Sequence, residues 1–183
     1  MLEKQNKLAG LTERIKPNWM ESLTPEQLAR YKAGEVSLGE LAGISGPEML
    51  EIAMQGFRMY EQGRYKEAKI IFEGLCDLDP SEAYYRTALG TVYLAEEQLE
   101  YAKNNFDLAL VLNPKSLAGL VNRGEVHLRL GDIVEAAQDF TKAVELDPEN
   151  KDPLTMRARL LAAAALETIE AAQKEASAGP AKK

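Results

Sequence analysis

The chain has 183 residues, of which 45% are hydrophobic and 28% are charged, and its formal net charge is −7. This composition suits a folded protein with an apolar core rather than a disordered chain, and the acidic balance leaves no basic stripe that would bind nucleic acid. The longest apolar run, residues 160–166, is too short to insert into a membrane. Because the single cysteine, Cys76, cannot form an internal disulfide and residues 2–16 do not read as a signal peptide, we expect a cytoplasmic protein.

Residues 1–46 form an amino-terminal extension that contains signals for short helices. Three apolar residues recur at helical spacing, namely Leu8, Leu11 and Ile15. Thr24 is a capping residue that is followed by Pro25 and, three positions on, by Gln27, and Ser37 with Glu40 is a weaker version of the same signal. Helices this short are marginal alone, so they must dock on the first repeat, on a second copy of the chain, or on a partner. We predict that the extension makes the protein a dimer.

A period of 34 residues begins after the extension. Four columns of residues share it: Pro80, Pro114 and Pro148; Gly56, Gly90 and Gly124; Ala68, Ala102 and Ala136; Phe72, Phe106 and Phe140. A helix–turn–helix unit of about 34 residues is the tetratricopeptide signature. The glycine allows the second helix of a pair to approach the first closely, and proline cannot continue the second helix.

The columns predict an all-α fold of three repeats, at residues 49–82, 83–116 and 117–150. The expected helices are Pro47–Glu61, Tyr65–Leu78, Glu82–Ala95, Leu99–Leu112, Ser116–Leu130 and Ile133–Leu146. Between the helices of a pair, Gly63 and Gly131 supply a residue that tolerates the left-handed conformation, whereas the second repeat has Glu97 there. We therefore expect that turn to be more strained.

Stacked repeats leave an apolar face at their end, which a terminal helix has to cover. We predict this capping helix at Asp152–Lys174, where Leu154, Ala158 and Leu161 recur at helical spacing. The repeats and the cap make one domain, residues 47–175, and residues 176–183 are expected to be a flexible tail.

Two stretches around the first repeat resemble a particular family. They are the leucine-rich lead-in Val36–Ile44 and the ending Phe72–Asp79, which reads Phe-Glu-Gly-Leu-Cys-Asp-Leu-Asp. Together with Gly56–Ala68 they are similar to the class II chaperones of bacterial type III secretion, which guard pore-forming translocator proteins. The resemblance implies three tetratricopeptide repeats, a helical extension used in dimer formation and a translocator-like client. The likeness is good over residues 36–95 and generic beyond them.

The first helix of each repeat is expected to line a concave groove for this client. Counting from Met49, Ala83 and Leu117, we assign the second, fifth, ninth and twelfth places to the groove; they include a single charge, Glu125. An apolar strip suits an extended peptide with apolar anchors, unless the extension or another subunit fills it. The predicted binding residues are Leu50, Ala53, Phe57, Tyr60, Tyr84, Thr87, Thr91, Leu94, Val121 and Leu128. We expect them to face away from the repeat core, so that Leu94→Glu would leave the fold intact.

No residue pattern indicates an enzyme, a cofactor or a metal site. His127 is the only histidine, at a place that packs between helices, and no set of histidines and cysteines has the spacing of metal ligands. The remaining alternative is a scaffold or adaptor in another assembly, favoured by a third repeat close to the general consensus and by the alanine-rich cap from Arg157.

Overall fold

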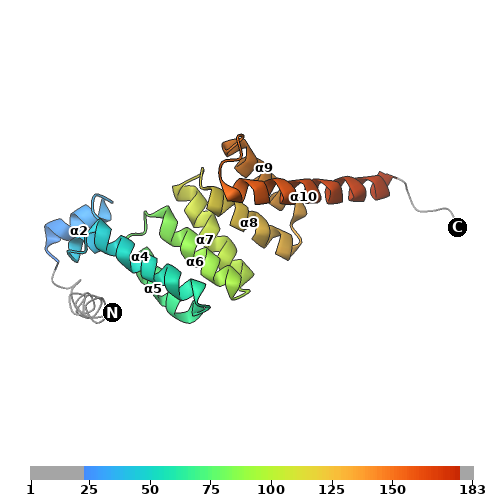
Figure 1. Cartoon of the computed structure of the whole chain (residues 1–183). Helices are drawn as coiled ribbons and strands as arrows, with labels where there is room; N and C mark the ends of the chain where they lie inside the picture. Colours follow the sequence, from blue (N-terminus) through green and yellow to red (C-terminus); the bar gives the residue numbers. More distant parts are fainter. Residues whose placement is uncertain (1–22, 178–183) are drawn as a thin grey trace. The chain divides into compact units, whose positions relative to one another are not determined.

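A computed structural model of the chain describes residues 23–177, which form helices and turns and no strand (Figure 1). The chain divides into two compact units between Ser81 and Glu82. The helices of the first unit are α2 (Pro25–Lys32), α3 (Leu38–Leu41), α4 (Gly46–Glu61) and α5 (Tyr65–Leu78). Those of the second unit are α6 (Ala83–Ala95), α7 (Leu99–Leu112), α8 (Leu117–Leu130), α9 (Ile133–Leu146) and α10 (Pro153–Ser177).

The prediction of an all-α repeat fold is confirmed, and the six repeat helices begin and end within one residue of the predicted bounds. The capping helix α10 continues three residues beyond the predicted Lys174 and so includes the first two residues of the predicted tail. The rest of that tail, and the predicted helix around Leu8, Leu11 and Ile15, lie outside the described residues.

Hydrogen bonds at the helix starts explain the order in the described part of the extension. Thr24 and Ser37 each accept the backbone N–H three residues on, while the side chains of Gln27 and Glu40 accept the capping residue's own N–H. Helix α3 docks on the first repeat, because a Cβ on the buried Gly39 would lie 2.9 Å from the Met49 sulfur. Among the three docking alternatives, the structure therefore supports the first repeat for this part of the extension.

In the second and third repeats, the repeated glycine packs directly against the phenylalanine of the paired helix. A Cβ added to Gly90 would lie 2.7 Å from the Phe106 ring, and one added to Gly124 would lie 2.6 Å from Phe140. Both phenylalanines are fully buried, and burial of a large side chain is a major source of stability. The 34-residue columns thus mark the contact that holds each helix pair together.

The turns between paired helices adopt the conformation expected from the sequence. Gly63 and Gly131 have φ angles of 71° and 88°, and Glu97 has a φ of 59°. A left-handed φ is unfavourable for a residue with a side chain. The prediction that the turn of the second repeat is more strained is therefore confirmed.

A partly buried ion-pair cluster joins three helices of the second unit. Arg123 on α8 donates from Nε and Nη2 to the Asp139 carboxylate on α9, at 2.7 and 2.6 Å, and from Nη1 to Asp107 on α7 at 2.7 Å. These hydrogen bonds, that to Asp139 first, raise the pKa of Arg123 above its usual value. The cluster fixes the positions of α7 and α9 on the two sides of α8.

Candidate binding surface on the first helices of the repeats

Helix α4 carries a row of large exposed apolar side chains. Leu50, Met54 and Phe57 are 55%, 54% and 48% exposed. Their spacing of four and then three residues places them on one face of the helix. We call this row the apolar stripe. Monomeric proteins seldom leave such rows uncovered, so the stripe is a candidate binding surface.

Aromatic rings extend the apolar stripe toward the end of α4. The rings of Phe57 and Tyr60 are stacked with their centroids 6.3 Å apart, and Tyr60 lies 5.6 Å from Tyr65 at the start of α5. Contacts of this kind hold Phe57 in place while leaving half of it exposed. The stripe is therefore a preorganised surface.

The corresponding face of α6 in the second unit is less apolar. Tyr84 is exposed and contacts Tyr85 edge-on at 5.9 Å, and partial burial raises the pKa of the Tyr84 hydroxyl. Thr91 donates to the Thr87 carbonyl oxygen at 2.9 Å and accepts a hydrogen bond from the Asn122 amide on α8 at 3.3 Å. The exposed face of α6 therefore contains polar groups that already have hydrogen-bond partners within the protein.

Charges dominate the matching face of α8. Glu125 accepts a hydrogen bond from Arg129 at 2.9 Å and another from Arg157, which reaches it from α10. Arg129 also lies 3.7 Å from the Glu97 carboxylate. The sequence analysis found only one charge, Glu125, at the places assigned to the groove. It did not predict this cluster, because Arg129 and Arg157 are outside those places.

The assignment of the fifth place to the groove is wrong. Its occupants in the three repeats, Ala53, Thr87 and Val121, are all buried. The twelfth place is also less open than expected, because Leu94 packs in the core with Ala102, Phe106 and Val126 and Leu128 is half-buried. The expectation that Leu94→Glu leaves the fold intact is therefore wrong, because it would bury a charge in that core.

Helix geometry explains the error. The fifth and twelfth places lie three residues before and four residues after the glycine at the eighth place, so they share its inward face. In α4 the exposed face instead contains the second, sixth, ninth and thirteenth places, namely Leu50, Met54, Phe57 and Glu61. Met54, at the sixth place, is therefore the exposed residue of this row that sequence reasoning missed. The repeated glycine was the signal that could have found it.

The predicted residues thus separate into three groups. Leu50, Phe57 and Tyr84 are exposed, and Tyr60, Thr91 and Leu128 are half-buried, while the other four are core residues. Leu50 and Phe57 lie together on α4 within the first unit. Tyr84, Thr91 and Leu128 lie in the second unit, on α6 and α8.

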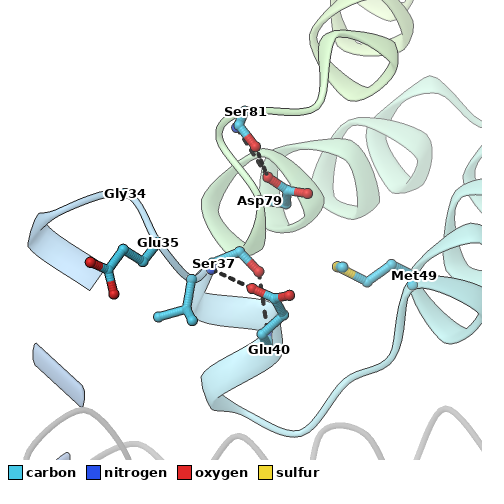
Figure 2. Close-up of a pocket in the computed structure, with 9 residues that line it drawn as sticks. Gly34, Glu35, Ser37, Glu40, Met49, Asp79 and Ser81 are labelled. Carbon is cyan, nitrogen blue, oxygen red and sulfur yellow. Dashed lines mark hydrogen bonds between the residues drawn. The ribbon is translucent and has the colours of Figure 1, made fainter. Parts of the chain in front are cut away.

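A separate pocket of about 350 Å³ lies where the extension meets the first repeat (Figure 2). Carboxylates of Glu35, Glu40 and Asp79 line it, and each already has a partner. Glu40 accepts from the Ser37 N–H at 2.8 Å, Asp79 accepts from the Ser81 hydroxyl at 2.6 Å, and Glu35 lies 3.5 Å from the Arg30 guanidinium. We interpret it as a structural junction. Within residues 23–177 no group of three or more side chains is arranged to hold a metal ion.

None of the helices in the described part of the chain is long and apolar enough to cross a membrane. His127 is buried, with its Nδ1 3.2 Å from the Asp132 carboxylate in the turn before α9. This position agrees with its interpretation as a packed histidine.

The fold and the repeated contacts are those of a tetratricopeptide-repeat protein, and the family model for that repeat matches residues 118–150. Among curated proteins, the chain is 26% identical to the low calcium response locus protein H of Yersinia pseudotuberculosis, over 73% of this chain and 81% of that protein. It is 33% identical to a BBSome complex member, BBS4, of Xenopus tropicalis over 51% of this chain. The chain spans only 18% of the length of that protein.

Solved structures give a consistent result. A type III secretion complex from Aeromonas hydrophila has a similar fold, with a TM-score of 0.72 over 80% of this chain and 99% of that one, at 24% identity. The translocator chaperone SycD of Yersinia enterocolitica, solved with a peptide of the translocator YopD, has a TM-score of 0.63 at 26% identity, over 68% of this chain and 97% of that one. The resemblance to the translocator chaperones is thereby confirmed.

Proposed function

We propose that this protein is a chaperone that holds an extended apolar segment of a type III secretion translocator before secretion. The observation that carries the proposal is the apolar stripe: Leu50, Met54 and Phe57 present large, exposed and uncharged side chains on one rigid helix. An extended segment can place its own apolar side chains against such a row and so keep them out of water. A translocator that is to enter a membrane needs this protection before it is exported.

The comparisons support the same client class. The similar structures of SycD and PcrH were solved with peptides of the translocators YopD and PopD. We propose that the present chain uses the apolar stripe for the apolar anchors of its client.

A clamp for a carboxy-terminal carboxylate is the second candidate, because the first repeat domain of Spaghetti (RPAP3), bound to an HSP90 peptide, has a TM-score of 0.58 at 25% identity. A clamp needs basic side chains that are ready to bind an anion. Here Arg129 and Arg157 are both paired with Glu125, which also lowers the local positive charge. We therefore favour the apolar client.

In this proposal the protein has no catalytic role, and it acts in the cytoplasm, where the client awaits export. We also propose that it forms a homodimer, and the prediction that the extension contributes to that dimer remains untested. The alternative of a scaffold in another assembly uses the same stripe for a different partner.

Photo-crosslinking separates the two functions. A photoreactive amino acid at position 54 of the full chain, introduced in the organism that encodes it, should capture a secreted protein through an apolar segment of that protein. The same amino acid at Glu73, an exposed position on α5, serves as a control for nonspecific capture. Capture of a subunit that is not secreted would contradict the chaperone proposal and favour the scaffold.

A further inference from the structure

The second half of the capping helix α10 forms one wall of an apolar groove whose other wall is helix α9. Two hollows of about 480 and 570 Å³ lie between these helices and share Val134 and Ile169. Val134 on α9 and Leu166 on α10 are 50% and 48% exposed. We call this surface the α9–α10 groove. Its lining also includes Gln138, Thr141 and Ala172.

The groove exists because α10 is longer than the first helix of a repeat. Ala165 stands 34 residues after Gly131, at the place where the repeats turn in a left-handed conformation. Alanine favours the helix at this place, and α10 continues to Ser177. The part of α10 before Ala165 already covers the end of the repeats, because Ala158 and Ala162 pack into a core cluster with residues of α8 and α9. The cap therefore does not need the turns that follow.

Helix α9 also differs from the second helices of the other repeats on the face that lines the groove. Three places there are uncharged in α9 and charged in both other helices. They are Val134, Ala137 and Thr141 in α9, Lys66, Lys69 and Glu73 in α5, and Glu100, Lys103 and Asp107 in α7. Packing explains Ala137, which is buried, but not Val134, which stays half exposed. An apolar residue left open where the repeat tolerates charge indicates a binding surface.

We propose that the α9–α10 groove binds an amphipathic helix of a partner protein, with lysine or arginine near both ends of that helix. From Val134 to Glu145 the groove is about 16 Å long, which is about three helical turns. Both walls are helices, and a third helix can pack its side chains between theirs. An extended segment would instead place unpaired backbone groups against the apolar lining. The groove uses no side chain of the apolar stripe, so the proposal goes beyond the client site and does not depend on it.

Charges at the ends of the groove favour a basic partner. Glu135 and Glu145 are exposed and line the two ends, while Lys142 is the one basic residue in the lining of the two hollows. The two glutamates are about 15 Å apart along α9. Basic residues about three turns apart on the partner helix would therefore each meet a carboxylate. The net charge of −7 on the chain disfavours a second copy as the occupant.

A synthetic peptide tests the groove in the full chain. A fluorescent helix of about 15 residues, with leucines on one face and lysines in both end turns, should bind saturably in fluorescence anisotropy. A peptide with glutamates in place of the lysines should bind at least about tenfold more weakly. Leu166→Lys should weaken binding of the lysine peptide roughly 30-fold with an unchanged melting temperature. Leu160→Lys, at an exposed apolar site on α10 outside the groove lining, is the matched control and should bind as wild type does.

Two further variants test charge and location. The double variant Glu135→Gln, Glu145→Gln should lower the affinity for the lysine peptide and reduce its dependence on salt. Phe57→Glu should leave peptide binding unchanged, because the apolar stripe is a different site.

Four results with the peptides would each overturn the proposal: no saturable binding, equal affinity for the glutamate peptide, full affinity of Leu166→Lys, or loss of binding in Phe57→Glu. Sedimentation velocity provides a fifth. If wild type self-associates and Leu166→Lys abolishes that association, a second copy occupies the groove and the proposal is wrong.

Discussion

Two glycines in the first unit have opposite surroundings and therefore opposite predicted effects. A Cβ on Gly56 would lie 2.9 Å from Ile71 and 3.0 Å from the Phe72 ring, whereas a Cβ on Gly74 in α5 would meet no atom within 4 Å. Gly56→Ala should destabilise the protein by about 1–3 kcal/mol through overpacking. Gly74→Ala should stabilise it by about 0.5–1 kcal/mol through its better helix propensity. Chemical denaturation of both variants tests this, and equal effects would contradict the packing described for the repeat.

The Asp147 carboxylate, after α9, connects the last repeat to the cap. It accepts the backbone N–H of Asp152 at 2.9 Å and of Lys151 at 3.1 Å, and the Thr155 hydroxyl at 2.8 Å. These hydrogen bonds, that to Asp152 first, lower the pKa of Asp147. Because the folded state prefers the ionised form, the carboxylate stabilises the fold at neutral pH, and this contribution is lost as the pH falls from about 4 toward the lowered pKa.

Asp147→Asn tests this dependence. Free energies of unfolding measured from pH 6 down to pH 3 should fall less steeply for the variant than for wild type, because asparagine does not titrate. An identical slope for the two proteins would show that Asp147 does not contribute to the acid sensitivity of the fold.

At the scale of helices, the sequence predicts nearly the whole fold. Glycine, alanine, phenylalanine and proline recur at one period, so each column marks the same place in every helix pair and the bounds follow within a residue. The acidic or amide residue before each proline stabilises the turn that follows the second helix of a repeat. Asp79 and Asn113 accept the N–H of Ser81 and Lys115, both at 3.1 Å. Ion pairs between helices could not be predicted in the same way. Glu125 and Arg157, for example, are 32 residues apart and no repeat column links them.

Prediction of the candidate site from sequence was less complete for a similar reason. The choice of the second and ninth places found Leu50, Phe57 and Tyr84, which are exposed. The fifth place failed because a small or polar residue there, such as Ala53 or Thr87, does not reveal by its type that it is buried. Geometry relative to the repeated glycine decides the face, whereas residue type alone does not.

The Arg123 cluster makes a prediction about how the helices of the second unit hold together. The side chain of Asp139 is 7% exposed, and Arg123 is its ion-pair partner. Arg123→Met leaves this carboxylate buried without that partner and should cost about 3 kcal/mol or more of unfolding free energy. The double variant Arg123→Met, Asp139→Leu should recover most of the loss, because both charges are then absent. No recovery in denaturant titrations would contradict a role for the ion pair itself.

At the scale of the whole molecule, the exposed faces of the first helices differ in composition between the two units. The apolar stripe lies on α4 in the first unit, whereas α6 and α8 in the second unit carry charges and polar groups that already have hydrogen-bond partners. The net charge of −7 opposes close approach of two copies.

The central claim is that the apolar stripe binds the client, and its most direct test is the affinity of full-length Phe57→Glu for the secreted protein captured at position 54. Phe57 is half exposed, so the variant should melt within a few degrees of wild type while its dissociation constant rises roughly 30-fold. Ile70→Glu, an exposed apolar site on α5 of the same unit, should bind as wild type does. A folded Phe57→Glu variant with undiminished affinity would contradict the account.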